Sequence, residues 1–341
     1  MSAAARRGAG LATRVGAVEL ANPVMTASGT SGHGSELAEY GALADLGAVV
    51  VKSLAAEPWP GNPAPRVHEV GGGMLNSVGL QGPGLRAWST ADLPALAASG
   101  ARVVVSIWGR TVDDYARAAE LAAAAAASAD GACIVAVEVN VSCPNVEDRS
   151  RMFAHSAEAT ARVMAATECG LPRWAKLSPN VPDLVEIATG ALEAGAHGLT
   201  LVNTLLGLAL DTETGRPLLG AGGGGLSGPA VHPVAVRAVW ECRAAFPDVA
   251  IVGVGGVASG VDAIELLQAG ADAVQVGTAT FRDPRAPWKV LRQLARWCAA
   301  HGTTVEELRA GARGRDDALG RTDAETDEET EARSATPGRR A

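Results

Sequence analysis

The sequence predicts an α/β fold, and within it a (β/α)8 barrel, from three observations. Short apolar runs alternate with stretches rich in Ala, Leu and Glu, which are typical of strands and helices respectively. The apolar runs are nearly continuous, which indicates parallel strands covered on both faces. Eight such runs occur, the number that closes a (β/α)8 barrel. A doubly wound open sheet is the alternative.

The predicted elements follow one another regularly along the chain. In order, the predicted strands are 22–28, 48–53, 102–107, 134–141, 173–178, 198–204, 249–256 and 273–279. Helical patterns lie between them, for example VDDYARAAELAAAAAASAD (112–130) and GVDAIELLQAG (260–270).

Three segments depart from this alternation. Residues 54–90 form a Pro/Gly-rich inserted loop region after the second strand, too long for a simple βα loop, and such loops usually help to build a site. GGGGLSG (222–228) predicts a further flexible loop, which would cover the ligand of that site. Residues 313–341 are charged and nearly free of apolar side chains, which predicts a disordered tail after a catalytic domain at 1–312.

Composition excludes several classes of protein. The 341 residues are 48% hydrophobic with a net charge of −8, which argues against disorder and gives no reason to expect nucleic acid as a partner. Five cysteines without a CxxC pair form neither a disulfide framework nor a zinc site, and the six histidines show no metal-ligand spacing, so we expect no metal. No signal peptide and no run of about 18 apolar residues is found, so we expect a cytoplasmic protein that does not span a membrane.

Polar or glycine residues end nearly every predicted strand. They are Ser28, Lys52, Ser53, Ser106, Asn140, Lys176, Asn203, Thr204, Gly255, Gly256, Gly277 and Thr278. In a (β/α)8 barrel these strand ends meet at one rim, where active sites lie. The sequence therefore predicts an active site built from most of the strands.

The last two strands and two lysines indicate what this site binds. The glycine pairs after strands seven and eight predict a phosphate site made of backbone N–H groups. Lys52 and Lys176 end apolar strands, where a buried cation needs an anionic or polar ligand. One or both are expected to lie against an electron-accepting ring, whose reduced form a positive charge stabilises.

The fourth strand ends in EVNVSCPN (138–145), which contains the most probable reactive thiol of the chain. Pro144 stops the strand and stiffens the turn, while Asn140 and Asn145 supply hydrogen bonds to a planar polar ligand. Cys143 is therefore the cysteine that we predict to have a functional role. The remaining cysteines fit the start of a strand, helices or helix ends.

These motifs together resemble the class 1 dihydroorotate dehydrogenases, and most closely the catalytic subunit of the class 1B type. The resemblance rests on NPVMTASGTSGHG (22–34), VVVKS (49–53), NPAPRVHEVGGGMLNSVGLQGPG (62–84), EVNVSCPN (138–145), AKLSPNV (175–181), LVNTLLGLALD (201–211), GGLSGPA (224–230), VGVGGVASG (252–260) and AVQVGTATF (273–281). It implies a flavin enzyme that oxidises (S)-dihydroorotate to orotate in de novo pyrimidine (UMP) synthesis.

The resemblance also implies roles for individual residues. One FMN per chain would contact Ser28, Lys52, Ser53, Ser106, Asn140, Lys176, Val202, Gly228, Gly255, Gly256, Gly277 and Thr278. The substrate would contact Lys52, Asn76, Ser77, Val78, Gly79, Leu80, Asn140, Asn145, Asn203 and Thr204. Cys143 would remove the C5 proton while the C6 hydride goes to the flavin. The barrel would form a homodimer and pair with a subunit that carries FAD and a [2Fe–2S] cluster, giving a heterotetramer that passes electrons to NAD⁺.

Two residues differ from the family pattern, and other readings stay open. Ser106 stands where the family usually has Asn, and GLQGPG (79–84) replaces GLQNPG, so that Gly82 lacks a side chain. We interpret both changes as tuning the site. The alternatives are a dihydropyrimidine dehydrogenase-type barrel acting on uracil or thymine, a fumarate-linked class 1A enzyme, and a non-catalytic phosphate-binding barrel.

Overall fold

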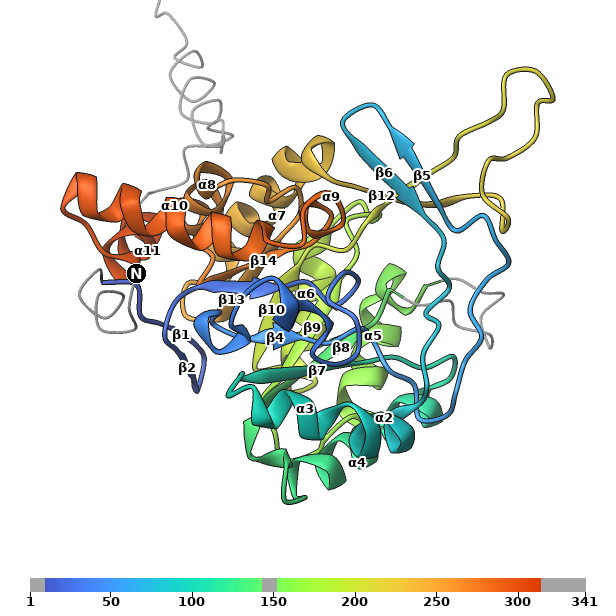
Figure 1. Cartoon of the computed structure of the whole chain (residues 1–341), viewed down its shortest axis with the longest axis horizontal. Coiled ribbons are helices and arrows are strands. Elements are labelled where there is room, and N and C mark those ends of the chain that lie inside the picture. Colours follow the sequence, from blue (N-terminus) through green and yellow to red (C-terminus); the bar gives the residue numbers. More distant parts are fainter. Residues whose placement is uncertain (1–9, 143–151, 314–341) are drawn as a thin grey trace, which may run out of the picture.

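The computed structural model describes residues 10–142 and 152–313, and its centre is a closed barrel of parallel strands (Figure 1). In spatial order the strands are β3 (Val24–Thr26), β14 (Ala273–Val276), β13 (Ala250–Val254), β10 (Gly198–Leu201), β9 (Arg173–Leu177), β8 (Ile134–Asn140), β7 (Val103–Ile107) and β4 (Val49–Val50). A parallel bridge between Met25 and Ala48 joins the first strand to the last. The eight strands coincide with the eight predicted runs, and the (β/α)8 barrel is confirmed.

Helices surround the barrel. They are α2 (Leu85–Ala91), α3 (Leu93–Ala98), α4 (Val112–Ala126), α5 (Ala157–Ala166), α6 (Leu184–Glu193), α7 (His232–Ala245), α8 (Gly260–Ala269), α9 (Ala279–Arg282), α10 (Ala286–His301) and α11 (Val305–Arg313). Short 3-10 turns lie at η1 (Glu36–Glu39), η2 (Leu43–Asp45), η3 (Gly131–Cys133), η4 (Phe153–His155) and η5 (Pro229–Val231). Only η1 and η2 fill the crossover between β3 and β4. None of the helices in the described ranges is both long and apolar enough to cross a membrane.

Side-chain alternation along the strands divides the core into two parts. On β8, Val137 and Val139 pack in the large cluster between barrel and helices, whereas Ala136 packs in a second cluster inside the barrel. Successive residues of a strand point to opposite faces, and both faces of this sheet are buried. This double burial explains why the strand sequences are nearly continuous in apolar residues.

A hairpin that the sequence reading did not predict closes the N-terminal end of the barrel. Strands β1 (Thr13–Val15) and β2 (Val18–Leu20) pair in antiparallel fashion. Val15, Val18 and Leu20 pack against Trp174 and the other inner side chains. With this end filled by apolar side chains, the C-terminal ends of the strands form the open end of the barrel.

The insertion after β4 is more ordered than its sequence indicated. It contributes β5 (Val67–Val70) and β6 (Gly73–Asn76) to a four-stranded antiparallel sheet with β12 (Gly224–Ser227) and β11 (Leu205–Gly207). In Figure 1 this sheet lies on the side of the barrel away from β1 and β2.

The prediction of a flexible loop at 222–228 is therefore wrong, because most of this stretch is strand β12. Its glycines allow close packing of the strand on its neighbours. A Cβ at Gly225 would lie 2.1 Å from Oγ1 of Thr204, and one at Gly224 would lie 2.5 Å from the carbonyl oxygen of Asn76. Glycine here serves close approach of two strands rather than flexibility.

Candidate active site

A cavity of about 230 Å³ opens at the C-terminal ends of the barrel strands and is partly covered by the four-stranded sheet. Most of the residues predicted for the site line it: Ser28, Lys52, Ser53, Asn76, Val78, Gly79, Leu80, Asn140, Lys176, Val202, Asn203, Thr204, Gly228, Gly255, Gly256, Gly277 and Thr278. They come from seven barrel strand ends, β6 and the loops beside β6 and β12. The tertiary structure therefore gathers residues that lie far apart in the sequence, from Ser28 to Thr278.

One end of the cavity is a cradle of glycine backbone. Gly255 and Gly256 follow β13, and Gly256 has a φ of +68°, in the left-handed region. A Cβ at Gly256 would lie 2.6 Å from Cβ of His232, so only glycine fits. One ring nitrogen of His232, Nδ1, lies 2.8 Å from the carbonyl oxygen of Gly255 and links this turn to the start of α7. Such a turn presents backbone N–H groups closely to an anion and fits a phosphate group.

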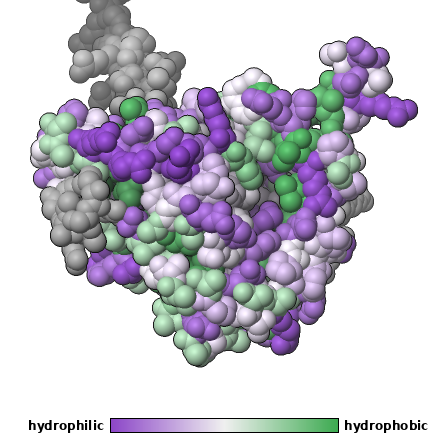
Figure 2. Space-filling model, viewed as in Figure 1, coloured by the Kyte–Doolittle hydropathy of each residue, from purple (hydrophilic) through white to green (hydrophobic). Residues whose placement is uncertain are grey.

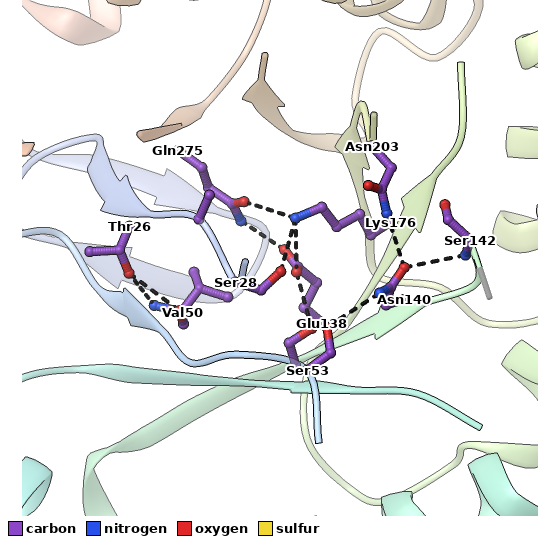
Figure 3. A network of polar contacts seen from close by, with 12 residues as sticks. Thr26, Ser28, Val50, Ser53, Glu138, Asn140, Ser142, Lys176, Asn203 and Gln275 are labelled. Carbon is purple, nitrogen blue, oxygen red and sulfur yellow. Dashed lines mark hydrogen bonds and ion pairs between the residues drawn. The ribbon is translucent and has the colours of Figure 1, made fainter. Parts of the chain in front are cut away.

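Lys176, at the floor of the cavity, belongs to a buried ion pair that is shown in Figure 3. Nζ of Lys176 lies 3.3 Å from Oε1 of Glu138, and both side chains are almost fully buried. Lys176 also donates to Ser28 Oγ at 3.1 Å and to Gln275 Oε1 at 3.3 Å. Removal of one partner from a buried pair typically costs about 3–5 kcal/mol, because a charge is left uncompensated. The pair therefore places one cation in the cavity wall and balances it from below.

A chain of amide and hydroxyl groups continues from this floor towards the opening of the cavity. Asn140 donates from Nδ2 to Ser53 Oγ at 3.2 Å, and its Oδ1 accepts from Nδ2 of Asn203 at 3.1 Å. The backbone N–H of Ser142 donates to the same Oδ1 at 3.2 Å. The hydroxyl of Tyr115 donates to the carbonyl oxygen of Asn140 at 2.6 Å and fixes the end of β8. These amides offer donors and acceptors at the edge of a planar ligand.

The loop between β6 and α2 supplies the wall opposite this chain. Leu80 has a φ of +61° and is the only non-glycine residue of the described ranges with a positive φ. A non-glycine residue in this region costs about 1 kcal/mol or more and is found preferentially at functional sites. Leu80 and Gly79 both line the cavity, so the strained turn directs the loop into the site.

Of the predicted site residues within the described ranges, two do not line the cavity. Ser106 is fully buried beneath the wall, where its Oγ lies 2.9 Å from Ser53 Oγ and donates to Glu138 Oε1 at 3.2 Å. Ser77 faces the preceding segment instead, where it accepts from Nδ2 of Asn62 at 2.9 Å. Ser106 does not reach the cavity because its side chain is short, and its hydroxyl contacts Ser53 and Glu138 instead.

Gly82, the other departure from the family pattern, lies against a half-buried histidine, His33. A Cβ at Gly82 would be 3.2 Å from Nε2 of His33, which has no hydrogen-bond partner in the described part of the chain. Burial lowers the pKa of His33, and the nearby ammonium of Lys52 lowers it further. His33 therefore occupies space beside this loop that a larger residue at position 82 would need.

Cys143 and Asn145 lie outside the described residues, so their predicted roles are not tested by the geometry. Ser142, the last described residue before them, lines the cavity. No group of three potential metal ligands occurs within residues 10–142 and 152–313.

Sequence reasoning missed two buried residues at the floor, Glu138 and Gln275. Each stands alone as a polar residue within an apolar strand, in IVAVEVN and AVQV. The same signal identified Lys176, whose charge needs a partner. A search for the carboxylate that balances this lysine would have found Glu138.

The donor set fits a phosphorylated planar cofactor such as FMN. The glycine cradle lines the cavity with backbone, because a Cβ at Gly255 or Gly256 would collide with Ala235 or His232, and the amide chain and Lys176 present polar groups to a ring. Ser28, Lys176 and Asn140 would lie along the ring, and Gly228, Gly255, Gly256, Gly277 and Thr278 would surround the phosphate.

Comparison with known proteins agrees with this geometry. The family model described as dihydroorotate dehydrogenase matches residues 10–297. A protein of Alkaliphilus oremlandii named "Dihydroorotate dehydrogenase B (NAD(+)), catalytic subunit" is 46% identical over 283 residues, 82% of this chain and 91% of its own. Proteins with the same name from Geobacter sulfurreducens and Pelobacter propionicus are 42% and 44% identical, covering 87% and 84% of this chain and 96% and 92% of their own. The chain thus belongs to the dihydroorotate dehydrogenase family.

Proposed function

We propose that the protein oxidises (S)-dihydroorotate to orotate with FMN as its cofactor, in the de novo synthesis of pyrimidine nucleotides. The observation that carries this proposal is the cavity itself. It combines a glycine cradle, a buried lysine and a row of asparagines in a chain that matches the dihydroorotate dehydrogenase family over residues 10–297.

The cavity residues divide into two groups in this proposal. Gly228, Gly255, Gly256, Gly277 and Thr278 would hold the phosphate through backbone N–H groups, and Lys176 and Ser28 would contact the ring. Thr278 is already oriented, because its hydroxyl donates to Ser227 Oγ at 2.7 Å. FMN, when bound, supplies the hydride acceptor of the reaction.

The second group holds the substrate. Lys52 and the backbone of the strained turn at Gly79 and Leu80 face the carboxylate, while Asn76 and Asn203 orient the pyrimidine ring. Asn76 is held by its Nδ2, which donates to the carbonyl oxygen of Gly225 at 3.2 Å. Asn203 is held by Asn140 on one side and by the backbone N–H of Thr204, at 2.8 Å, on the other. Side chains fixed in this way lose little further freedom when the substrate binds.

Cys143 is the proposed base, and Asn145 is a proposed contact of the substrate. The thiolate takes the proton from C5, a hydride leaves C6, and the substrate gains a C5=C6 double bond. The C5 proton and the C6 hydride must leave from opposite faces of the ring, because the base and the hydride acceptor cannot occupy the same side. The preceding residue, Ser142, lines the cavity and donates its backbone N–H to Asn140, which supports a site role for the residue that follows it.

We propose further that electrons pass to NAD⁺ through a partner subunit that carries FAD and a [2Fe–2S] cluster, with two barrels and two such subunits in the complex. The names of the relatives contain "NAD(+)" and "catalytic subunit", which supports NAD⁺ as the acceptor and a separate partner subunit. Exposed apolar side chains also border the cavity, since Val67 and Phe281 are 53% and 57% exposed. Figure 2 shows hydrophobic surface beside the β5–β6–β12 sheet. We place this complex in the cytoplasm, where free thiols such as the four cysteines of the described ranges persist.

Purification of the full chain tests the function directly. The protein is expected to be yellow, to release FMN on denaturation, and to form orotate from dihydroorotate with an artificial electron acceptor. NADH formation is expected only after addition of the partner subunit, and fumarate is expected not to replace it. A colourless protein, or one that reduces uracil with NADPH but does not oxidise dihydroorotate, would contradict the proposal.

A further inference from the structure

Glu138 is a fully buried carboxylate for which the proposed reaction has no use. It lies on β8, has an exposed fraction of 0%, and does not belong to the cavity wall. Its closest neighbour in that wall is Lys176, whose Nζ lies 3.3 Å from its Oε1. A buried charge of this kind is costly unless each oxygen finds a partner, so its contacts indicate what the residue does.

Each oxygen of Glu138 has a donor from a different strand. Oε1 accepts from Lys176 on β9 and from Ser106 on β7, and Oε2 accepts from Nε2 of Gln275 on β14 at 2.7 Å. Gln275 in turn accepts a hydrogen bond from Lys176 through Oε1 at 3.3 Å. Glu138, Gln275 and Lys176 therefore form a closed ring of hydrogen bonds beneath the cavity (Figure 3).

This ring fixes the position of the lysine ammonium. An ammonium group has three donors, and those of Lys176 go to Glu138, Gln275 and Ser28. The first two acceptors lie below the floor, whereas Ser28 lines the cavity. Only the donor that points to Ser28 is free to turn towards a ligand without breaking the ring.

We propose that Glu138 is a positioning residue, which holds the Lys176 ammonium at the floor of the flavin site and balances its charge. The proposal rests on the proposed binding of FMN. It concerns a residue that touches neither cofactor nor substrate and acts through Lys176.

The balance of charge has a consequence that can be measured. Reduced flavin carries added negative charge near the ring, which a neighbouring cation favours. Glu138 opposes this effect, because its negative charge, 3.3 Å from Nζ of Lys176, offsets part of the positive charge of the cation. Removal of the carboxylate charge should therefore make reduction of the bound flavin more favourable.

The test is the midpoint potential of FMN bound to the wild-type chain and to the variant Glu138→Gln. The substitution keeps the shape of the side chain and removes its charge. We expect the equilibrium constant for two-electron reduction to rise at least about tenfold, which is a potential more positive by about 30 mV. A rise of less than tenfold, or a fall, would overturn the proposal.

Asp272→Asn is the matched control. Asp272 is also a buried carboxylate, 2% exposed, and it pairs with Arg243 at 3.2 Å before the start of β14, at the other end of the barrel. A purely structural effect would lower stability in both variants without a change in potential. The proposal requires that the potential change at Glu138 and stay unchanged at Asp272.

A second comparison tests the dependence on Lys176, and remains possible if Glu138→Gln alone does not fold. In the background Lys176→Gln there is no cation for Glu138 to hold and no cation charge for it to offset. Glu138→Gln/Lys176→Gln and Lys176→Gln should then have equilibrium constants within tenfold of each other. A larger difference would show that Glu138 acts independently of the lysine.

The outcomes separate this inference from the proposed function. A wild-type protein that binds no FMN overturns both. A wild-type protein that binds FMN and forms orotate, but whose potential does not respond to Glu138→Gln, overturns the inference alone.

Discussion

Replacement of Gly256 by alanine is expected to weaken FMN binding, because this position leaves no room for a methyl group. The added Cβ would lie 2.6 Å from Cβ of His232, 2.9 Å from its backbone nitrogen and 3.0 Å from the carbonyl oxygen of Gly228. Two of these three atoms belong to the backbone, so the contact cannot be relieved by a side-chain rotation. Either the start of α7 or the glycine turn has to move.

The magnitude follows from two contributions. A left-handed conformation, here φ +68°, costs a non-glycine residue about 1–2 kcal/mol. Overpacking adds about 1–3 kcal/mol. The free energy of unfolding should therefore fall by about 2–5 kcal/mol. The turn that moves is also the phosphate cradle. The free-energy cost of overpacking should therefore also weaken FMN binding, by about 5- to 150-fold in affinity.

Gly170→Ala is the matched control for this experiment. Gly170 also has a left-handed φ, +71°, but a Cβ there has no atom within 4 Å. Gly170→Ala is expected to lower the free energy of unfolding only by the cost of the left-handed conformation, and to leave FMN affinity unchanged. Affinity is measured by the quenching of flavin fluorescence when FMN is added to the apoprotein, and stability by urea unfolding. Wild-type affinity in Gly256→Ala, or an equal loss in Gly170→Ala, would refute the assignment of this turn to the phosphate.

Three further predictions concern the thiol, the loop beside His33 and the response to acid. Cys143→Ala should retain FMN but lose about 10²–10⁴-fold in turnover at neutral pH, measured as orotate formation; full activity would exclude the thiol as base. Gly82→Asn should raise KM for dihydroorotate several-fold, because its Cβ would lie 3.2 Å from His33 Nε2. Gly82→Asn/His33→Ala should recover part of the loss. An unchanged KM in Gly82→Asn would show that the His33 side chain moves aside without cost. The ammonium of Lys289 donates to Asp283 and, with backbone N–H groups, holds the pKa of that carboxyl well below its usual range. A carboxyl whose pKa is lowered in the folded state stabilises the fold at pH values above its unfolded-state pKa of about 3.9. This contribution is lost as the pH falls through the folded-state pKa. The difference in Tm between wild type and Asp283→Asn should therefore shrink from pH 6 to pH 2; a constant difference would contradict the ion pair.

The eight barrel strands could be predicted from the sequence because their signal is local. Each strand is buried on both faces, so that nearly every residue is apolar, and the run ends where the chain reaches the rim. The β1–β2 hairpin gave no comparable signal. Its two strands have only three residues each and alternate between buried and exposed positions, which is too short a pattern to recognise.

The four-stranded sheet over the cavity could not be predicted, because it joins segments about 150 residues apart. Gly225 on β12 pairs with Asn76 on β6, and each segment by itself resembles a loop. A glycine-rich stretch is compatible with flexibility and with close strand packing alike. Only the position of Thr204 next to Gly225 decides between them.

The sequence by itself determined the barrel, the rim on which the site lies and most of the residues in its wall, because strand ends, glycine pairs and isolated polar residues are features of neighbouring positions. The tertiary structure decided which of these groups interact. It placed Ser106 beneath the wall and Glu138 under Lys176, and it set His33 against Gly82. The physical reason is that the cost of a buried charge depends on the partner that balances it, and the partners of Lys176 come from three other strands.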